Sequence, residues 1–167
     1  MGRSYLYQVS RRRTAFAKPF VWWLKEPLDL SRMAEAASRF SGMHDFRSFS
    51  DDDPEDKSTA VLIDEVRICE DGDLILIRVA GSHFLWKMVR RMVGVIVEIG
   101  RGGLPVAAVD EFLRRPSEVP ARLTAPASGL FLERVFYEGD TRALPLIAAV
   151  PVASSRIKLA AGQPGLQ

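Results

Sequence analysis

The feature that most constrains this chain is an apolar stretch at residues 83–99 that contains two adjacent arginines. At about 100° per residue, its apolar side chains cover most of a helix surface and leave a narrow polar strip. Arg90 falls at the edge of the apolar arc, where burial is expected, whereas Arg91 falls nearer the polar strip, where solvent or phosphate contact is expected. Because a buried guanidinium stays charged, Arg90 requires a carboxylate or phosphate partner.

The order of the predicted elements indicates an α+β fold. We expect a strand at 3–10, a helix capped by Asp29 or Ser31, strands at 59–69 and 73–80 joined through residues 70–72, the helix at 83–99, a short helix from Pro105, and a strand at 130–137. This βαββααβ order is close to the split βαβ, ferredoxin-like arrangement, with an antiparallel sheet of about four strands and helices on one face. The other face would stay free, and such faces often bind single-stranded RNA or another protomer.

The length and the charge distribution limit the organisation further. The 167 residues suffice for one domain, expected at 1–137, and the Ala- and Pro-rich residues 138–167 form a tail whose order stays open. A net charge of +2 does not by itself indicate a nucleic-acid binder. Residues 1–25, however, carry six basic side chains and no acid, so phosphate contact and simple solvation are both open there. The acidic run at 51–56 is expected to be a solvated loop.

Several classes of protein are disfavoured. Cys69 is the only cysteine, which excludes an intrachain disulfide and fits a reduced, cytoplasmic setting. His44 and His83 have no zinc-ligand spacing, so we expect no metal. The longest apolar segment is broken by Lys87 and the two arginines, and no membrane span is expected.

Four stretches together resemble one family, in the right order and at plausible spacing. They are RSYLY at 3–7, EPLDLSRMAEAASRFSGMHDFRSF at 26–49, HFLWKMVRRMVGVIVEIGRG at 83–102, and APASGLFLERVFY at 125–137. They are similar to the R-x-Y-x-Y strand, the G-x-H-D-F-x-S-F loop with its helix, the M-V-R-x-M-V-G helix and the A-P-x-x-G-L-x-L strand of the TruA-type tRNA pseudouridine synthases.

The resemblance implies an RNA isomerase that converts uridine to pseudouridine in the tRNA anticodon arm, acts as a homodimer and uses no metal or organic cofactor. The family's catalytic aspartate lies in an R-T-D-x-G segment, and no R-T-D occurs in this sequence. The chain therefore resembles the C-terminal half of such an enzyme, with the N-terminal half missing, and we expect it to be inactive alone. Two alternatives stay open: a non-catalytic RNA-binding domain, or a dimerisation domain that uses Trp22 and Trp23.

The resemblance also implies the roles of three residues. Arg90 matches the arginine that pairs with the catalytic aspartate, although an ordinary ion pair with Glu98, Asp45 or Glu133 remains possible. Tyr5 matches a catalytic tyrosine that could stack on the extruded uracil, although a strand tyrosine is more often a core residue. Leu130 matches the leucine that packs beneath the target base.

Further substrate contacts are predicted from charge and from one loop. Arg3, Arg11, Arg12 and Arg13 are expected to contact tRNA phosphates. Phe46, in the HDFRSF loop, is a candidate for the wall of the nucleotide pocket. The competing interpretation of this loop is a segment held by its own hydrogen bonds and by two buried phenylalanines.

Overall fold

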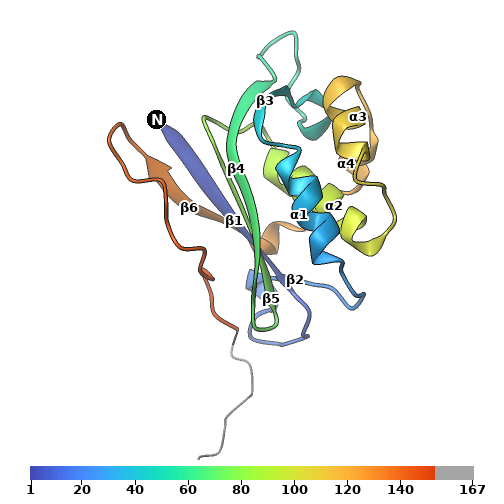
Figure 1. Cartoon of the computed structure of the whole chain (residues 1–167), viewed down its shortest axis with the longest axis vertical. Coiled ribbons are helices and arrows are strands. Elements are labelled where there is room, and N and C mark those ends of the chain that lie inside the picture. Colours follow the sequence, from blue (N-terminus) through green and yellow to red (C-terminus); the bar gives the residue numbers. More distant parts are fainter. Residues whose placement is uncertain (153–167) are drawn as a thin grey trace, which may run out of the picture.

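Strand β1 (Gly2–Ser10) lies at the centre of a six-stranded sheet (Figure 1). The computed structural model describes residues 1–152. The sheet order is β2-β1-β5-β4-β3, and β6 also pairs with β1. The other strands are β2 (Trp22–Trp23), β3 (Gly42–Asp45), β4 (Ala60–Asp71), β5 (Leu74–Gly81) and β6 (Leu130–Phe136).

The α+β class and the helices on one sheet face are confirmed, but the sheet is larger than predicted. The two additional strands, β2 and β3, are too short to show an alternating pattern in the sequence. All strand pairs are antiparallel except β1 with β2, which is parallel. The hairpin between β4 and β5 turns at Gly72 and Asp73 rather than at residues 70–72, and Gly72 supplies the positive φ of 59° that this turn requires.

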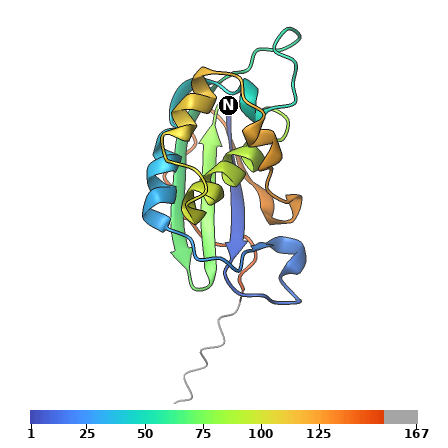
Figure 2. The same ribbon diagram turned by 90° about the vertical axis from the view of Figure 1, so that its right-hand side faces the viewer.

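The helices all lie on one side of the sheet (Figure 2). They are α1 (Leu30–Ser38), α2 (Met88–Arg101), α3 (Ala108–Arg114) and α4 (Val119–Arg122). The carboxylate of Asp29 accepts a hydrogen bond from the Arg32 amide and caps α1. Of the two capping residues that the sequence offered, Asp29 and Ser31, the cap is therefore Asp29. None of the helices among residues 1–152 combines the length and apolarity needed to cross a membrane.

Helix α2 begins five residues later than predicted, and this changes which side chains it buries. Trp86 precedes the helix and is 67% exposed, although the sequence placed it within the apolar arc. Lys87, the residue before the first helical turn, has a positive φ of 61°. Met92 and Ile96 are fully buried between the sheet and the other helices, as expected.

The strand predicted at 3–10 is confirmed as β1, and its two faces join two different apolar clusters. Tyr7 and Val9 are fully buried on the helix side with Ile75 and Ile77 of β5. Leu6 belongs to a smaller cluster on the other side, with Leu74 and Leu76 among its members.

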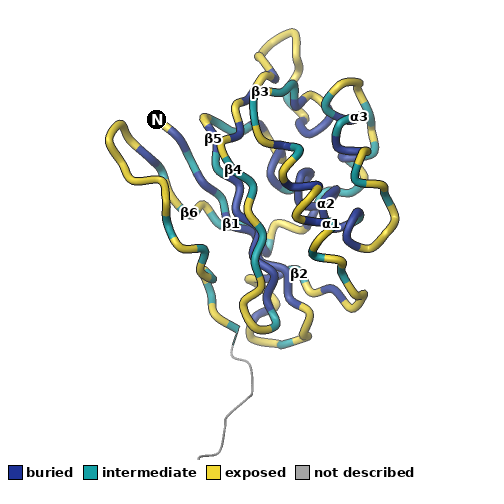
Figure 3. The backbone as a smooth tube through the Cα atoms, viewed as in Figure 1, coloured by how far each residue is buried: buried dark blue, intermediate teal, exposed yellow. Residues whose placement is uncertain are grey.

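The sheet face opposite the helices is partly covered, which corrects the prediction that it stays free. After β6 the chain returns along this face (Figure 3), and Leu146, Ala148 and Val152 pack against the smaller cluster. The buried Gln8 side chain donates to the Val150 carbonyl and accepts hydrogen bonds from the amides of Ala149 and Val150. Residues 144–152, here called the C-terminal strap, thus occupy part of the surface that sequence reasoning assigned to RNA or a protomer. The rest of the predicted tail, residues 153–167, lies outside the described residues.

Candidate functional site

A cavity of about 430 Å³ opens where β1, the N-terminal end of α2 and the start of β6 meet. Its lining includes Tyr5, Arg90 and Leu130, so three residues singled out from the sequence lie at one place although 125 positions separate the first from the last. The remaining lining residues are Asp52, Lys57, Phe84, Leu85, Trp86, Lys87, Met88, Val89 and Ala127. Its volume falls in the usual range of small-molecule sites, and we call it the Tyr5–Arg90 cavity.

Arg90 is half-buried and fixed by the segment that follows α4. Its Nε donates to the Ala125 carbonyl at 2.7 Å, and the Ala125 amide donates to the Arg90 carbonyl at 3.0 Å. No carboxylate of residues 1–152 forms an ion pair with Arg90, so the pairs with Glu98, Asp45 or Glu133 that the sequence left open are not formed.

Arg91, not Arg90, is the more deeply buried arginine, and this corrects the prediction from the helical arc. Arg91 is only 5% exposed, and its guanidinium forms an ion pair with Asp51. Asp51 also accepts a hydrogen bond from Lys87 Nζ at 2.7 Å. The hydrogen bond from Lys87, followed by that from Arg91, holds the pKa of the Asp51 carboxyl below its usual value. Asp51 is therefore anchored at the start of α2, whereas Asp53, Glu55 and Asp56 of the same run are exposed, as predicted.

Tyr5 and Tyr7 point to the same side of β1 but have different surroundings. Tyr5 is half-buried, and its ring meets Phe84 edge-on with the centroids 4.9 Å apart. Tyr7 is fully buried and donates its hydroxyl to the Pro126 carbonyl at 2.7 Å. Burial raises the pKa of Tyr7, and the charge of Arg90 offsets only part of this rise. Tyr5 is therefore the tyrosine available to a ligand, and Tyr7 supports the segment that leads to Leu130.

Sequence reasoning missed several residues of the cavity. Lys57 adds a second cation to the lining, beside Arg90. Asp52 accepts hydrogen bonds from the Trp86 amide and from Ser50 Oγ, and the first of these contributes most to lowering its pKa. Lys87 carries the left-handed backbone conformation, which is uncommon outside glycine and concentrates at functional sites.

Phe46 does not line the cavity, contrary to the prediction. It is fully buried beside Phe40 and Phe49 in the main core. The adjacent Asp45 accepts hydrogen bonds from Arg47 and from Thr59 Oγ1, so the competing interpretation, a loop held by its own hydrogen bonds, describes this segment.

The predicted phosphate-binding arginines are not gathered at the cavity. Arg3 lies on the same face of β1 as Tyr5, two residues closer to the N-terminus, but does not line it. Arg11 is held at the β4–β5 hairpin by Glu70 and the Gly72 carbonyl. Arg12 is exposed, and Arg13 places its guanidinium 5.4 Å from the centroid of the Trp23 ring.

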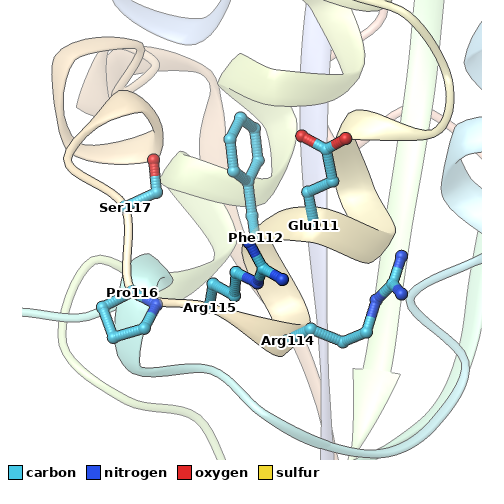
Figure 4. A pocket seen from close by; sticks show the side chains of 6 residues that line it. All are labelled: Glu111, Phe112, Arg114, Arg115, Pro116 and Ser117. Carbon is cyan, nitrogen blue, oxygen red and sulfur yellow. The ribbon is translucent and has the colours of Figure 1, made fainter.

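A separate cavity of about 430 Å³ lies at the end of α3 (Figure 4). Glu111, Arg114 and Arg115 contribute charges of both signs to it, together with Phe112, Pro116 and Ser117. None of the residues predicted for a site lies there. Among residues 1–152, no three His, Cys, Asp or Glu side chains gather so that they could hold a metal ion.

Comparison with known proteins gives one consistent result. The model of a family described as tRNA pseudouridine synthase matches residues 36–138. The chain is 39% identical over 136 residues to tRNA pseudouridine synthase A of Geobacter sulfurreducens, which covers 80% of this chain and 56% of that protein. It is 42% identical over 125 residues to the protein of the same name from Pelobacter propionicus, covering 75% and 51% of the two chains. The corresponding Pseudomonas aeruginosa protein is 37% identical over 142 residues, covering 84% and 50%. The chain thus spans about half the length of the curated relatives it matches.

Proposed function

Because the chain belongs to the tRNA pseudouridine synthase family, we propose that it takes part in converting uridine to pseudouridine in the anticodon arm of tRNA. The reaction breaks the bond between N1 of the base and C1′ of the ribose, turns the base, and joins C5 to C1′. The proton lost from C5 is balanced by the proton gained at N1, so the reaction needs no oxidant or reductant. The observation that carries the proposal is the meeting of Tyr5, Arg90 and Leu130 in one cavity.

The cavity provides the groups that an extruded uridine requires. Extruding a base from its stack costs a few kcal/mol, which contacts in the pocket must offset. The half-buried Tyr5 ring and the Leu130 side chain offer apolar surface to the base. Arg90 and Lys57 provide positive charge for the phosphates or for a carboxylate.

We propose that the reacting carboxylate is the aspartate of an R-T-D-x-G segment, which does not occur in this sequence. Asp52 is the acid that lines the cavity among residues 1–152, and the Trp86 amide and Ser50 hydroxyl already hold it in place. Arg90 has no carboxylate partner in this part of the chain, and a cation within about 4–6 Å would keep an incoming aspartate ionised. Arg90 is therefore suited to receive a carboxylate, while Asp52 anchors a loop.

The experiment is tritium release from tRNA that carries 5-tritiated uridine. The chain is assayed alone and again with the R-T-D-x-G half of a relative supplied as a second polypeptide. We expect no release by the chain alone and measurable release from the mixture. In the mixture, Arg90→Ala and Tyr5→Ala should lower kcat by at least tenfold, whereas Arg122→Ala, which removes an exposed arginine of α4, should not.

Two outcomes would overturn parts of this proposal. Turnover by the chain alone that is lost in Asp52→Asn would place the reacting carboxylate within this chain. A mixture that binds tRNA but releases no tritium would contradict the catalytic function and would favour a non-catalytic RNA-binding domain.

A further inference from the structure

A second cavity, of about 530 Å³, lies beside the proposed uridine site. It is lined by the loop after β1, by β2 and by the turn before β6: Arg13, Thr14, Ala15, Lys18, Val21, Trp23 and Ser128. None of these residues is acidic, and residues 1–25 contain no acid at all. The cavity is therefore suited to an anionic ligand.

The two cavities share one turn of the chain. Ala127 lines the Tyr5–Arg90 cavity and Ser128 lines the second one, so neighbouring residues of the turn Ala127–Gly129 separate the two cavities. Consecutive Cα atoms lie about 3.8 Å apart. The hydroxyl of Ser128 donates to the Val21 carbonyl at 3.2 Å, which fixes this turn to the loop after β1. Figure 2 shows the segment around residues 120–130 beside that loop, along one edge of the sheet.

Trp23 and Arg13 give the second cavity a stacking surface. The Trp23 side chain is 41% exposed although it belongs to a strand of the sheet, and the Arg13 guanidinium lies over its ring. Exposed indole rings and guanidinium planes are the groups on which bases of single-stranded RNA stack. Lys18, exposed at the same cavity, supplies a charge for a phosphate.

We propose that this cavity binds the nucleotide next to the target uridine in a single-stranded RNA segment. The base stacks on Trp23 and Arg13, and the adjoining phosphate contacts Lys18. The proposal rests on the proposed function, because it identifies the neighbour of the uridine that is proposed to enter the Tyr5–Arg90 cavity. It assigns to β2 and the loop after β1 a role in holding the strand, separate from the chemistry at Arg90.

The test measures binding of a fluorescein-labelled oligouridylate to the chain by fluorescence anisotropy. Trp23→Ala should weaken binding about 5- to 100-fold, as expected for the loss of one stacked base. Trp23→Phe, which keeps an aromatic face, should recover most of the affinity. Phe16→Ala is the matched control, because Phe16 is a 95% exposed aromatic residue of the same loop outside the cavity.

The role of Lys18 is tested by salt dependence. Lys18→Ala should reduce the slope of log K against log salt by about 0.7, the value for one phosphate contact on a single strand. Lys25→Ala, which removes an exposed lysine outside the cavity, should leave the slope unchanged. Equal effects of the two variants would show that general charge, not a phosphate site, attracts the RNA.

Three results would overturn the proposed nucleotide site. One is an equal loss of affinity in Trp23→Ala and Phe16→Ala, and another is the absence of oligouridylate binding by the unaltered chain. The third is a change in sedimentation of Trp23→Ala without a change in RNA affinity, which would assign the surface to a second copy of the chain. If Trp23→Ala has no effect but Tyr5→Ala weakens binding, the proposed function stands and only the neighbouring site fails.

Discussion

Arg90 and Ala125 are joined by a reciprocal pair of hydrogen bonds, from the arginine Nε to the alanine carbonyl and from the alanine amide to the arginine carbonyl. The pair connects α2 to the segment that leads, through Pro126 and the turn at 127–129, to Leu130. Because the Pro126 carbonyl also accepts a hydrogen bond from the Tyr7 hydroxyl, two separate parts of the chain, α2 and β1, are held against one short segment. The position of Arg90 in the cavity therefore depends on backbone contacts as well as on its own helix.

The first prediction concerns Gly94, where α2 touches this segment. A Cβ added at Gly94 would lie 1.7 Å from the Leu123 carbonyl oxygen. The backbone of α2 or of the segment at Leu123 would therefore have to move to accept it. We expect Gly94→Ala to lower the free energy of unfolding by about 1–3 kcal/mol, although alanine favours a helix. Gly100→Ala is the control, because its Cβ would meet side-chain atoms of Met33 and Leu28 and no backbone atom, so that a smaller loss is expected. Urea unfolding of both variants checks this, and an equal loss in the two would contradict it.

The second prediction concerns the ion pair between Arg91 and Asp51. Asp51→Asn should lower the free energy of unfolding by about 1–3 kcal/mol, because it leaves a buried guanidinium without a charged partner. The lower half of this range is expected, since the Asp51 side chain is 42% exposed and water screens the pair. Asp56→Asn, in the same acidic loop, should change the value by less than about 0.5 kcal/mol. Chemical denaturation at neutral pH distinguishes the two variants.

The third prediction is the pH dependence that follows from the same loop. The pKa values of Asp51 and Asp52 are lower in the folded chain than their usual values, through hydrogen bonds from Lys87 and from the Trp86 amide respectively. Their stabilising contribution is therefore fully present above about pH 4 and is lost as the pH falls through the lower, folded pKa values. The free energy of unfolding should decline in that acidic range, and Asp51→Asn should make the decline shallower. If the free energy of unfolding declines equally in the unaltered chain and in Asp51→Asn, other acidic residues cause the decline.

The fourth prediction concerns the C-terminal strap. Gln8→Leu removes the side chain that bonds Ala149 and Val150 and should release the end of the strap, whereas Arg78 still bonds the carbonyls of Leu144 and Pro145. Limited proteolysis should then cut the strap several-fold faster than in the unaltered chain. Cleavage in the loop at 51–57 provides the internal reference, and a parallel increase there would indicate general destabilisation instead.

Much of the fold could be predicted because its pattern is local. The two faces of β1 follow directly from alternation, and the Asp29 cap follows from a short-range side-chain to amide contact. The strands β2 and β3 could not be predicted, because elements of two and four residues pair through neighbours that are distant in the sequence.

The site was predicted in part, for a related reason. The sequence resemblance singled out Tyr5, Arg90 and Leu130, because each lies in a motif with a distinct pattern, and the three side chains line one cavity. The sequence predicted that Arg90 is the more buried of the two arginines, whereas Arg91 is. The helix begins only at Met88, and Asp51, forty positions earlier in the sequence, neutralises Arg91. Phe46 was misplaced because a buried phenylalanine and a pocket phenylalanine look the same in a sequence.

The central place of β1 limits how the length of this chain can vary. Residues 2–10 pair with β5 on one edge and with β6 and β2 on the other. Inserting or deleting one residue there would exchange the two faces beyond that point, moving Tyr5 or Tyr7 toward the strap and Leu6 or Gln8 toward the helices. Insertions in the loop at 51–57 or in the hairpin at residues 72 and 73 would leave this alternation intact. Length changes should therefore be tolerated in those loops and excluded from β1.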